Sequence, residues 1–265
     1  MQSSPEAFQI TLDAAEVYEA RFVPAFFAEW APHLVDFARV APGQAVLDVA
    51  CGTGIVARTV ADRLGATGRV VGVDLNEAML SVARRVRSDI EWRQGDVATL
   101  PFADRSFDTV LCQMALMFFP DRAGALREMR RVVADGGSVA LLVPAHLGTQ
   151  PAYGPFVEMA ARHAGPDAAS LLSTYFACGR LEELTALVEA AGLHVTATRA
   201  RLGRAKFPSI DAFVATEVKG TPLADRISAP VYERIRAGAE EVLRPFLTAA
   251  GLEVPLEGHL VAGRR

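Results

Sequence analysis

The chain has 265 residues, 51% of them hydrophobic, and a formal net charge of -4 at pH 7. A chain of this length can bury a large hydrophobic core in one domain with an insertion. Its net negative charge provides no overall positive potential that would attract nucleic acid. Local basic clusters, such as Arg84, Arg85 and Arg87 on a predicted helix, suit a solvated helix face.

Cysteine usage and the amino-terminal residues favour a reducing cytoplasm. The three cysteines, Cys51, Cys112 and Cys178, are odd in number and far apart, which argues against a disulfide framework and a zinc knuckle. Residues 1–6 lack the basic start and apolar run of a signal peptide. The apolar stretch at 111–119 is too short to span a bilayer. We therefore expect a cytoplasmic protein with no metal site and no membrane span.

Residues 1–40 have a helical pattern that is rich in aromatic side chains. Phe26 and Phe27 can simply pack on the body of the protein, whereas Tyr18 is the preferred candidate for contact with a ligand. An aromatic face of this kind attracts a desolvated cation with on the order of 1 to 2 kcal/mol.

A strand, an acid and a glycine turn follow one another at residues 46–54. The apolar run that contains Asp48 leads into Gly52 and Gly54, and residues 55–64 have the pattern of a helix. Glycine permits positive φ and lets a ligand approach the main chain, while the first N–H groups of the helix face whatever lies over the turn. The sequence therefore predicts a nucleotide-cofactor turn with a carboxylate at its base.

Two classes of cofactor fit such a turn. The spacing of Gly52, Gly54 and Ala57 matches the dinucleotide fingerprint. A pyrophosphate beside Asp48 would be repelled by roughly 4 kcal/mol per charge pair at about 4 Å and an effective dielectric of about 20. S-adenosylmethionine carries an ammonium and a sulfonium that the same carboxylate attracts, and the helix start can receive its carboxylate. Asp48 therefore favours S-adenosylmethionine over NAD, and a simple capping role for this residue is the alternative.

Two further acids lie at the ends of predicted strands. Residues 69–75 contain a second strand that ends in Asp74, about twenty residues after the glycines, where a ribose-binding carboxylate is placed in such folds. A third strand at 90–92 leads to Asp96 and Val97. The Asp96 carboxylate can accept from an adenine amino group, and the Val97 N–H can donate to a ring nitrogen.

The rest of the chain alternates between strands and helices. This alternation predicts a mostly parallel sheet that is covered on both faces. The expected strands lie at 108–114, 138–143, 193–202 and 252–262, and the expected helices at 122–133 and 181–191.

Together these motifs resemble the class I S-adenosylmethionine-dependent methyltransferases, in particular the ubiquinone/menaquinone-biosynthesis type that acts on small molecules. The resemblance implies a Rossmann-like α/β fold: a seven-stranded, mostly parallel sheet with helices on both faces and the last strand antiparallel. It covers about residues 40–145 and is carried by residues 48–54, 73–76, 95–97, 100–102 and 106–108, followed by Gln113 and Met114.

The resemblance also implies S-adenosylmethionine as the cofactor. In that family the first motif binds the methionine end, the second acid holds the ribose, the third holds adenine, and the end of the fourth strand faces the methionine part and the acceptor. The expected cofactor-binding residues are Tyr18, Asp48, Ala50, Gly52, Gly54, Asp74, Leu75, Met79, Asp96, Val97, Gln113 and Met114.

We expect residues 1–265 to form a single methyltransferase domain. Within it, 1–40 would be a helical lid, 41–145 the cofactor-binding core, and 146–180 and 208–250 helical segments of the substrate pocket. His146 follows the fifth strand, at the edge where ligands bind in this architecture, and is the candidate general base.

These features predict methyl transfer from S-adenosylmethionine to N, O or C of a small, partly apolar molecule, with release of S-adenosylhomocysteine. The protein would align the acceptor with the methyl group and exclude water, and it needs a base only where the acceptor must lose a proton. The alternatives are a protein of the same fold that binds the cofactor without methylating, or an RNA or protein methyltransferase. The expected partner is a small-molecule acceptor rather than nucleic acid, and a homodimer is left open.

Overall fold

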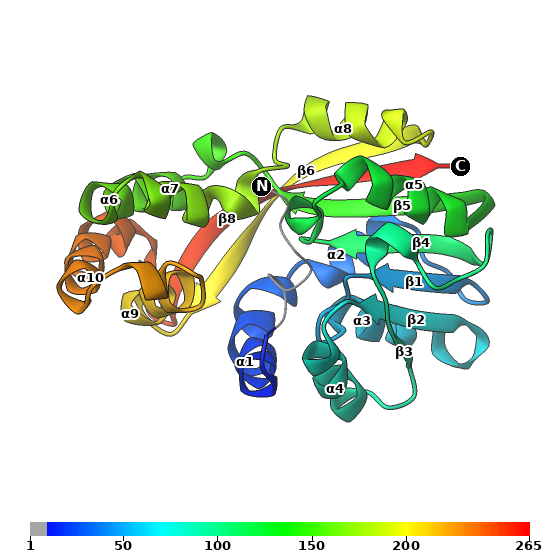
Figure 1. The fold of residues 1–265 in the computed structure, drawn as a ribbon, viewed down its shortest axis with the longest axis horizontal. Helices are drawn as coiled ribbons and strands as arrows, with labels where there is room; N and C mark the ends of the chain where they lie inside the picture. Colours follow the sequence, from blue (N-terminus) through cyan, green and yellow to red (C-terminus); the bar gives the residue numbers. More distant parts are fainter. Residues whose placement is uncertain (1–9) are drawn as a thin grey trace.

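The computed structural model describes residues 10–265, so the prediction made on residues 1–6 lies outside it. At its centre is a mixed sheet with the strand order β3-β2-β1-β4-β5-β8-β6, and a short β7 pairs with β8 (Figure 1). The strands are β1 (Ala45–Val49), β2 (Arg69–Asp74), β3 (Glu91–Gln94), β4 (Phe107–Gln113), β5 (Val133–Pro144), β6 (His194–Phe207), β7 (Leu247–Thr248) and β8 (Gly251–Arg264).

Helices cover both faces of this sheet. The helices α2, α3 and α4 pack on one face, and α5 and α8 pack on the other. The α-helices are α1 (Leu12–Val17), α2 (Ala31–Phe37), α3 (Ile55–Leu64), α4 (Glu77–Val86), α5 (Arg122–Val132), α6 (Tyr153–Ala164), α7 (Pro166–Ser173), α8 (Leu181–Ala190), α9 (Ile210–Val214) and α10 (Ala229–Leu243). Two π-helices, η2 (Tyr18–Phe27) and η8 (Ala215–Lys219), and short 3-10 turns complete the described part of the chain.

The predicted fold class is confirmed. Strands β1 to β5 pair in parallel, and β8 inserts antiparallel between β5 and β6. Strand β1 lies between β2 and β4, so the chain crosses over in opposite directions on its two sides. In open α/β sheets ligands bind at the carboxyl ends of the strands at such a switch point. The topology therefore predicts a ligand site beside the end of β1.

Strands β6 and β8 extend beyond the rest of the sheet. Pairing between β5 and β8 ends at Pro144, whereas β6 and β8 continue to pair as far as Phe207 and Leu252. Strand β6 is thus longer than the predicted 193–202. The two-stranded extension supports a group of helices formed by α6, α7, α9 and α10, and the helix α1 lies between this group and the sheet (Figure 1).

A tryptophan fixes the shape of the glycine turn. The Trp92 ring, from β3, packs against Gly54 and Gly72, and its Nε1 donates to the Arg87 carbonyl at 2.8 Å. A Cβ at Gly54 would lie 2.7 Å from Trp92 Cζ3 and closer still to Cη2. Gly54 also has φ +89°, so this position needs glycine both for its backbone conformation and for space.

We expect Gly54→Ala to destabilise the protein by more than Gly43→Ala does. Gly43 has nearly the same backbone conformation, φ +88°, but no atom lies within 4 Å of its ideal Cβ, so it isolates the backbone cost. The additional overpacking against the buried Trp92 ring should cost about 1 to 3 kcal/mol in the free energy of unfolding. Urea unfolding of both variants measures the difference, and equal losses would contradict the role given to Trp92.

Candidate functional site

One buried and one half-buried carboxylate lie beneath the glycine turn. Asp48 precedes the last residue of β1, and Asp74 ends the neighbouring β2. Among residues 10–265 neither carboxylate forms an ion pair with an arginine, lysine or histidine. The described chain therefore surrounds this pair of acids with neutral groups, which favours a cationic ligand at the site.

Asp48 is only 1% exposed, and its Oδ2 accepts a hydrogen bond from the Ala57 N–H at 2.9 Å. Burial raises the pKa of Asp48 to about 8; the Ala57 N–H opposes this rise, and the nearby Asp74 charge adds to it. In the free protein Asp48 is thus mostly protonated at neutral pH. A cation bound beside it would favour the ionised form and release the proton.

Asp74 organises the backbone of the turn. Its Oδ2 accepts from the Gly52 N–H and its Oδ1 from the Asn76 N–H, both at 2.8 Å. Burial raises the pKa of Asp74, and these N–H donors counteract the rise. Each carboxylate oxygen keeps a further lone pair, so Asp74 can still accept from ligand hydroxyls such as those of a ribose.

Orphaned polar atoms and left-handed backbone mark the same edge of the sheet. Thr53 Oγ1 and Gln113 Oε1 are buried and have no hydrogen-bond partner among the described residues. Ala50 and Met114, which follow β1 and β4, have φ values of +54° and +51°, a conformation that is uncommon outside glycine. Strained backbone and unsatisfied buried groups occur together at ligand sites, and the polar atoms here suit ammonium and hydroxyl donors.

The π-helix η2 forms a cover over the turn. The Tyr18 hydroxyl lies 3.6 Å from the ideal Cβ position of Gly52. Gln113 Nε2 donates to the Phe27 carbonyl at 3.1 Å, and Glu19 pairs with Arg58 on α3 at 2.9 Å. The predicted amino-terminal helix thus lies against the glycine turn, with the Tyr18 ring nearest to it.

The remaining predicted cofactor residues lie along the neighbouring strand ends. The Met79 N–H, in the first turn of α4, donates to Asn76 Oδ1, and the Leu75 carbonyl accepts from a side chain of β3. Asp96 is exposed and its Oδ1 accepts from the Ala98 N–H at 2.9 Å, while Val97 begins a 3-10 turn. The structure therefore brings all the predicted cofactor residues to one edge of the sheet, and their contact with a cofactor remains a prediction.

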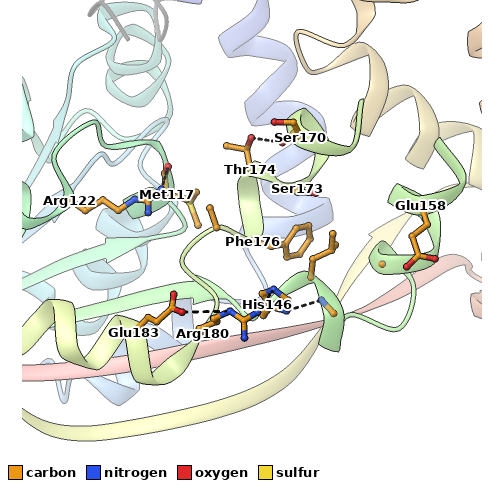
Figure 2. A pocket seen from close by; sticks show the side chains of 14 residues that line it. Met117, Arg122, His146, Glu158, Ser170, Ser173, Thr174, Phe176, Arg180 and Glu183 are labelled. Carbon is orange, nitrogen blue, oxygen red and sulfur yellow. Dashed lines mark hydrogen bonds and ion pairs between the residues drawn. The ribbon is translucent and has the colours of Figure 1, made fainter. Parts of the chain in front are cut away.

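His146 lies in an open cavity of about 710 Å³ (Figure 2). Its Nδ1 accepts from the Gly148 N–H at 3.1 Å, and its Nε2 lies 3.3 Å from Arg180 Nη2. Both ring nitrogens thus have partners in the chain. The role of His146 as a general base stays a prediction.

A second, smaller cavity was not predicted as a catalytic site. Its volume is about 20 Å³, and it is enclosed by one carboxylate, Glu217 of η8, and by six aromatic rings. Glu217 follows Phe213 and Val214 by four and three residues, so a carboxylate on the apolar face of a helix is the sequence signal that could have identified it. The rings are those of Phe22, Phe26, Phe27, Tyr153, Tyr175 and Phe176.

Membrane-spanning helices and metal centres are two further classes of site. Within residues 10–265, no helix is long and apolar enough to cross a membrane. The same residues contain no cluster of three or more His, Cys, Asp or Glu side chains that could hold a metal ion.

Comparison with known proteins identifies the central part of the chain. Residues 47–141 match a family described as a methyltransferase domain. A 2-phytyl-1,4-naphtoquinone methyltransferase of Thermosynechococcus vestitus is 41% identical over 121 residues, which cover 44% of this chain and 53% of that protein. A demethylmenaquinone methyltransferase of Renibacterium salmoninarum is 41% identical over 127 residues, covering 48% and 51%. The chain thus spans about half the length of the curated relatives it matches.

The fold is also similar to that of a solved structure. The YcgJ protein of Bacillus subtilis superimposes with a TM-score of 0.62 at 22% identity, covering 89% of this chain and 97% of that one. The family match and the curated relatives confirm the sequence resemblance to methyltransferases over the segment that carries the strand-end acids.

The raised pKa of Asp48 predicts that the ligand-free protein loses stability as pH rises. The folded state binds the Asp48 proton more tightly than the unfolded state, so the free energy of unfolding should fall between about pH 4 and pH 8, by up to about 1.4 kcal/mol per pH unit from this group. Asp48→Asn should flatten this slope and make the protein more stable than the natural chain at pH 8.

Urea unfolding at pH 5, 7 and 8 tests this expectation. Asp225→Asn is the matched control, because Asp225 is exposed and its replacement should leave the slope unchanged. Parallel pH profiles for the natural chain and Asp48→Asn would show that Asp48 is ionised in the free protein.

Proposed function

We propose that this chain, whose residues 47–141 form a methyltransferase domain, transfers the methyl group of S-adenosylmethionine to a small, quinone-type aromatic molecule. The other product is S-adenosylhomocysteine. Both curated relatives are named for methylation of naphthoquinone-type compounds, which supports this substrate class. The aromatic side chains that line the small cavity beside the lid suit contact with the face of an aromatic acceptor.

The observation that carries the proposal is that Asp48 is buried and has no cationic partner among residues 10–265. Its carboxylate has only a backbone N–H as a hydrogen-bond donor, and the nearest acid raises rather than lowers its pKa. A diphosphate would be repelled by the ionised form of Asp48 and would gain no charge attraction from the protonated form, whereas an ammonium or sulfonium would stabilise the ionised form. The same argument disfavours a nicotinamide dinucleotide.

The residues present fit the cofactor. Asp48 and the orphaned Gln113 Oε1 would receive its ammonium group, the helix start at Gly54 its carboxylate, and Asp74 its ribose hydroxyls. Asp96 and Val97 would contact the adenine. When bound, S-adenosylmethionine supplies a methyl group on a positively charged sulfur, which is already a good leaving group.

The chain's own contribution is alignment and exclusion of water. The lid residues of η2 cover the glycine turn and also form one wall of the aromatic cavity, so donor and acceptor would meet beneath the same cover. Holding two reactants in a fixed orientation lowers the entropic part of the barrier. We further propose that residues 1–265 act as one domain. We also propose that the enzyme works in the reducing cytoplasm, because its three cysteines are separate and free.

Titration calorimetry tests the cofactor assignment. At pH 7 S-adenosylmethionine should bind, and the heat should differ between phosphate and Tris buffers because Asp48 releases a proton when the cation binds. Asp48→Asn should bind more weakly and lose most of this proton release, and NAD should not bind. Binding of NAD in place of S-adenosylmethionine would overturn the proposal.

The reaction itself is tested by screening hydroxynaphthalenes and related acceptors for release of S-adenosylhomocysteine. Mass spectrometry should show a product that has gained one methyl group. A converted acceptor without an added methyl would instead favour the alternative in which the fold uses the cofactor for another reaction.

Asp74→Ala should weaken binding of S-adenosylmethionine by about 1 to 3 kcal/mol, through loss of hydrogen bonds to a charged acceptor. Asp121→Ala is the control, because Asp121 caps α5 through the Gly124 N–H and lies outside the proposed site. Calorimetry gives both affinities, and thermal melting verifies that each variant is folded. Equal affinities for the two variants would contradict the ribose assignment.

A further inference from the structure

The small aromatic cavity described above contains a single carboxylate, Glu217. Its Oε1 accepts a hydrogen bond from the Tyr153 hydroxyl at 3.3 Å. No arginine, lysine or histidine in residues 10–265 forms an ion pair with it. Lys219, two residues further along η8, lies over the Tyr232 ring, 4.4 Å from its centroid. The charge of Glu217 is therefore not neutralised by the chain.

The surroundings of Glu217 make it a proton acceptor near neutral pH. Burial raises the pKa of Glu217 to about 7, and the hydrogen bond from Tyr153 opposes the rise. The titratable groups that face it are two phenols, Tyr153 on α6 and Tyr175 on the turn before α8, and burial together with the Glu217 charge raises the pKa of both. Both phenols stay protonated at neutral pH, so Glu217 is the group that exchanges a proton there.

Aromatic rings of the lid connect the cavity around Glu217 to the proposed cofactor site. The Tyr18 ring lies against Gly52 on one side, and on the other it stacks on Phe22 at 5.8 Å and contacts Phe27 at 5.2 Å between centroids. Phe22 and Phe27 in turn line the cavity that contains Glu217. The Tyr18 ring and its two neighbours therefore connect the lining of this cavity to the glycine turn.

The size of the cavity indicates how an acceptor would enter. About 20 Å³ is room for roughly one water molecule and not for an aromatic ring. Two ion pairs tie the lid side of the cavity to the sheet helices: the partly buried Glu19–Arg58 pair from η2, and the exposed Glu16–Arg85 pair from the preceding α1. Entry of a flat ring would require η2 to move, with the Glu19–Arg58 pair as its main ionic restraint and the exposed pair contributing little.

We propose that the Glu217–Tyr153 pair is the proton-accepting site for the acceptor, and that the acceptor is an aromatic ring that carries a hydroxyl group. This inference rests on the proposed function. The aromatic walls would pack on the ring faces, and the carboxylate would accept the hydroxyl hydrogen bond, with Tyr153 orienting the carboxylate. An amine is disfavoured because a carboxylate among aromatic rings stabilises the protonated ammonium, which cannot attack a methyl group.

In the proposed reaction, a proton moves from the acceptor to Glu217 and a methyl group moves to the acceptor. The acceptor O–H bond breaks and its proton moves to a Glu217 oxygen. The electron pair left on the oxygen, directly or through the conjugated ring carbon, forms the new bond to the methyl group. The methyl–sulfur bond breaks and its pair stays on sulfur, giving neutral S-adenosylhomocysteine. Where carbon is the attacking atom, that carbon then loses its own proton to water.

Calorimetry with defined probes tests the site without requiring turnover. The S-adenosylhomocysteine complex is titrated at pH 8 with 1,4-dihydroxynaphthalene, kept reduced, and with 1,4-dimethoxynaphthalene, which has no hydroxyl hydrogen. We expect the dihydroxy compound to bind at least tenfold more tightly, and Glu217→Gln to remove most of this preference. Equal binding of the two probes, equal binding by Glu217→Gln, or no binding of either probe would overturn the inference.

The pH dependence separates a proton acceptor from a structural carboxylate. With 1,4-dihydroxynaphthalene as acceptor, kcat/KM of the natural chain should rise through a pKa near 7. Glu217→Gln should reduce kcat by about 10²- to 10⁴-fold and abolish the rise. Tyr153→Phe keeps the ring but removes the donor that lowers the pKa of Glu217, so it should shift the profile to higher pH with a smaller loss of rate.

Two controls distinguish failure of this inference from failure of the proposed function. Glu217→Gln should bind S-adenosylmethionine as the natural chain does, because Glu217 is outside the glycine turn. If the natural chain does not bind S-adenosylmethionine, the proposed function itself is refuted. A normal rate and pH profile in Glu217→Gln, with cofactor binding intact, would refute only the role of Glu217.

Discussion

The site depends on two adjacent carboxylates, one buried and one half-buried, that have no counter-ion among residues 10–265. Asp48 and Asp74 receive hydrogen bonds from the backbone N–H groups of Ala57, Gly52 and Asn76. These bonds lower the cost of burial but do not remove it, since burial still raises the pKa of both acids. In the free protein this cost favours the protonated form of Asp48, and a bound cation would favour the ionised form instead. We expect selectivity for a cationic ligand to follow from this coupling rather than from the shape of the glycine turn.

The aromatic lid connects this electrostatic site to the acceptor cavity. Tyr18 contacts the glycine turn, and its ring neighbours Phe22 and Phe27 line the cavity around Glu217. A single movement of η2 would therefore change access to both sites.

Much of the fold could be predicted because its signals are local. Strands β1 and β2 are short apolar runs with an acid at or next to the last residue, and α3 occupies the predicted residues 55–64. The start of β8 at Leu252 was also predicted, but the long end of β6 was missed because its pairing is non-local: Phe207 pairs with Leu252 across an intervening helical segment, and residues 203–206 are small or basic. No pattern within one strand reveals such a partner.

The acids of the glycine turn could be predicted for the same reason, whereas the packing and charge environment around them could not. Trp92 is adjacent to Gly54 and Gly72 only after β3 joins the sheet. Glu217 becomes an isolated carboxylate only when η2, α6 and η8 come together around it. Sequence spacing identifies which residue types follow one another, but burial and the absence of a counter-ion arise from tertiary contacts.

The structure of η2 suits a segment that must both cover the site and move. Its backbone bonds reach five residues back, as in the 2.8 Å bond from the Ala28 N–H to the Val23 carbonyl, and Pro24 within it has no N–H to donate. A wider helix with a missing donor is held less tightly by its own backbone than an α-helix is. Its position then depends on side-chain contacts, chiefly the aromatic stack and the Gln113 amide. Because these contacts face the site, a bound donor and acceptor can alter the balance between closed and open lid directly, through the atoms they touch.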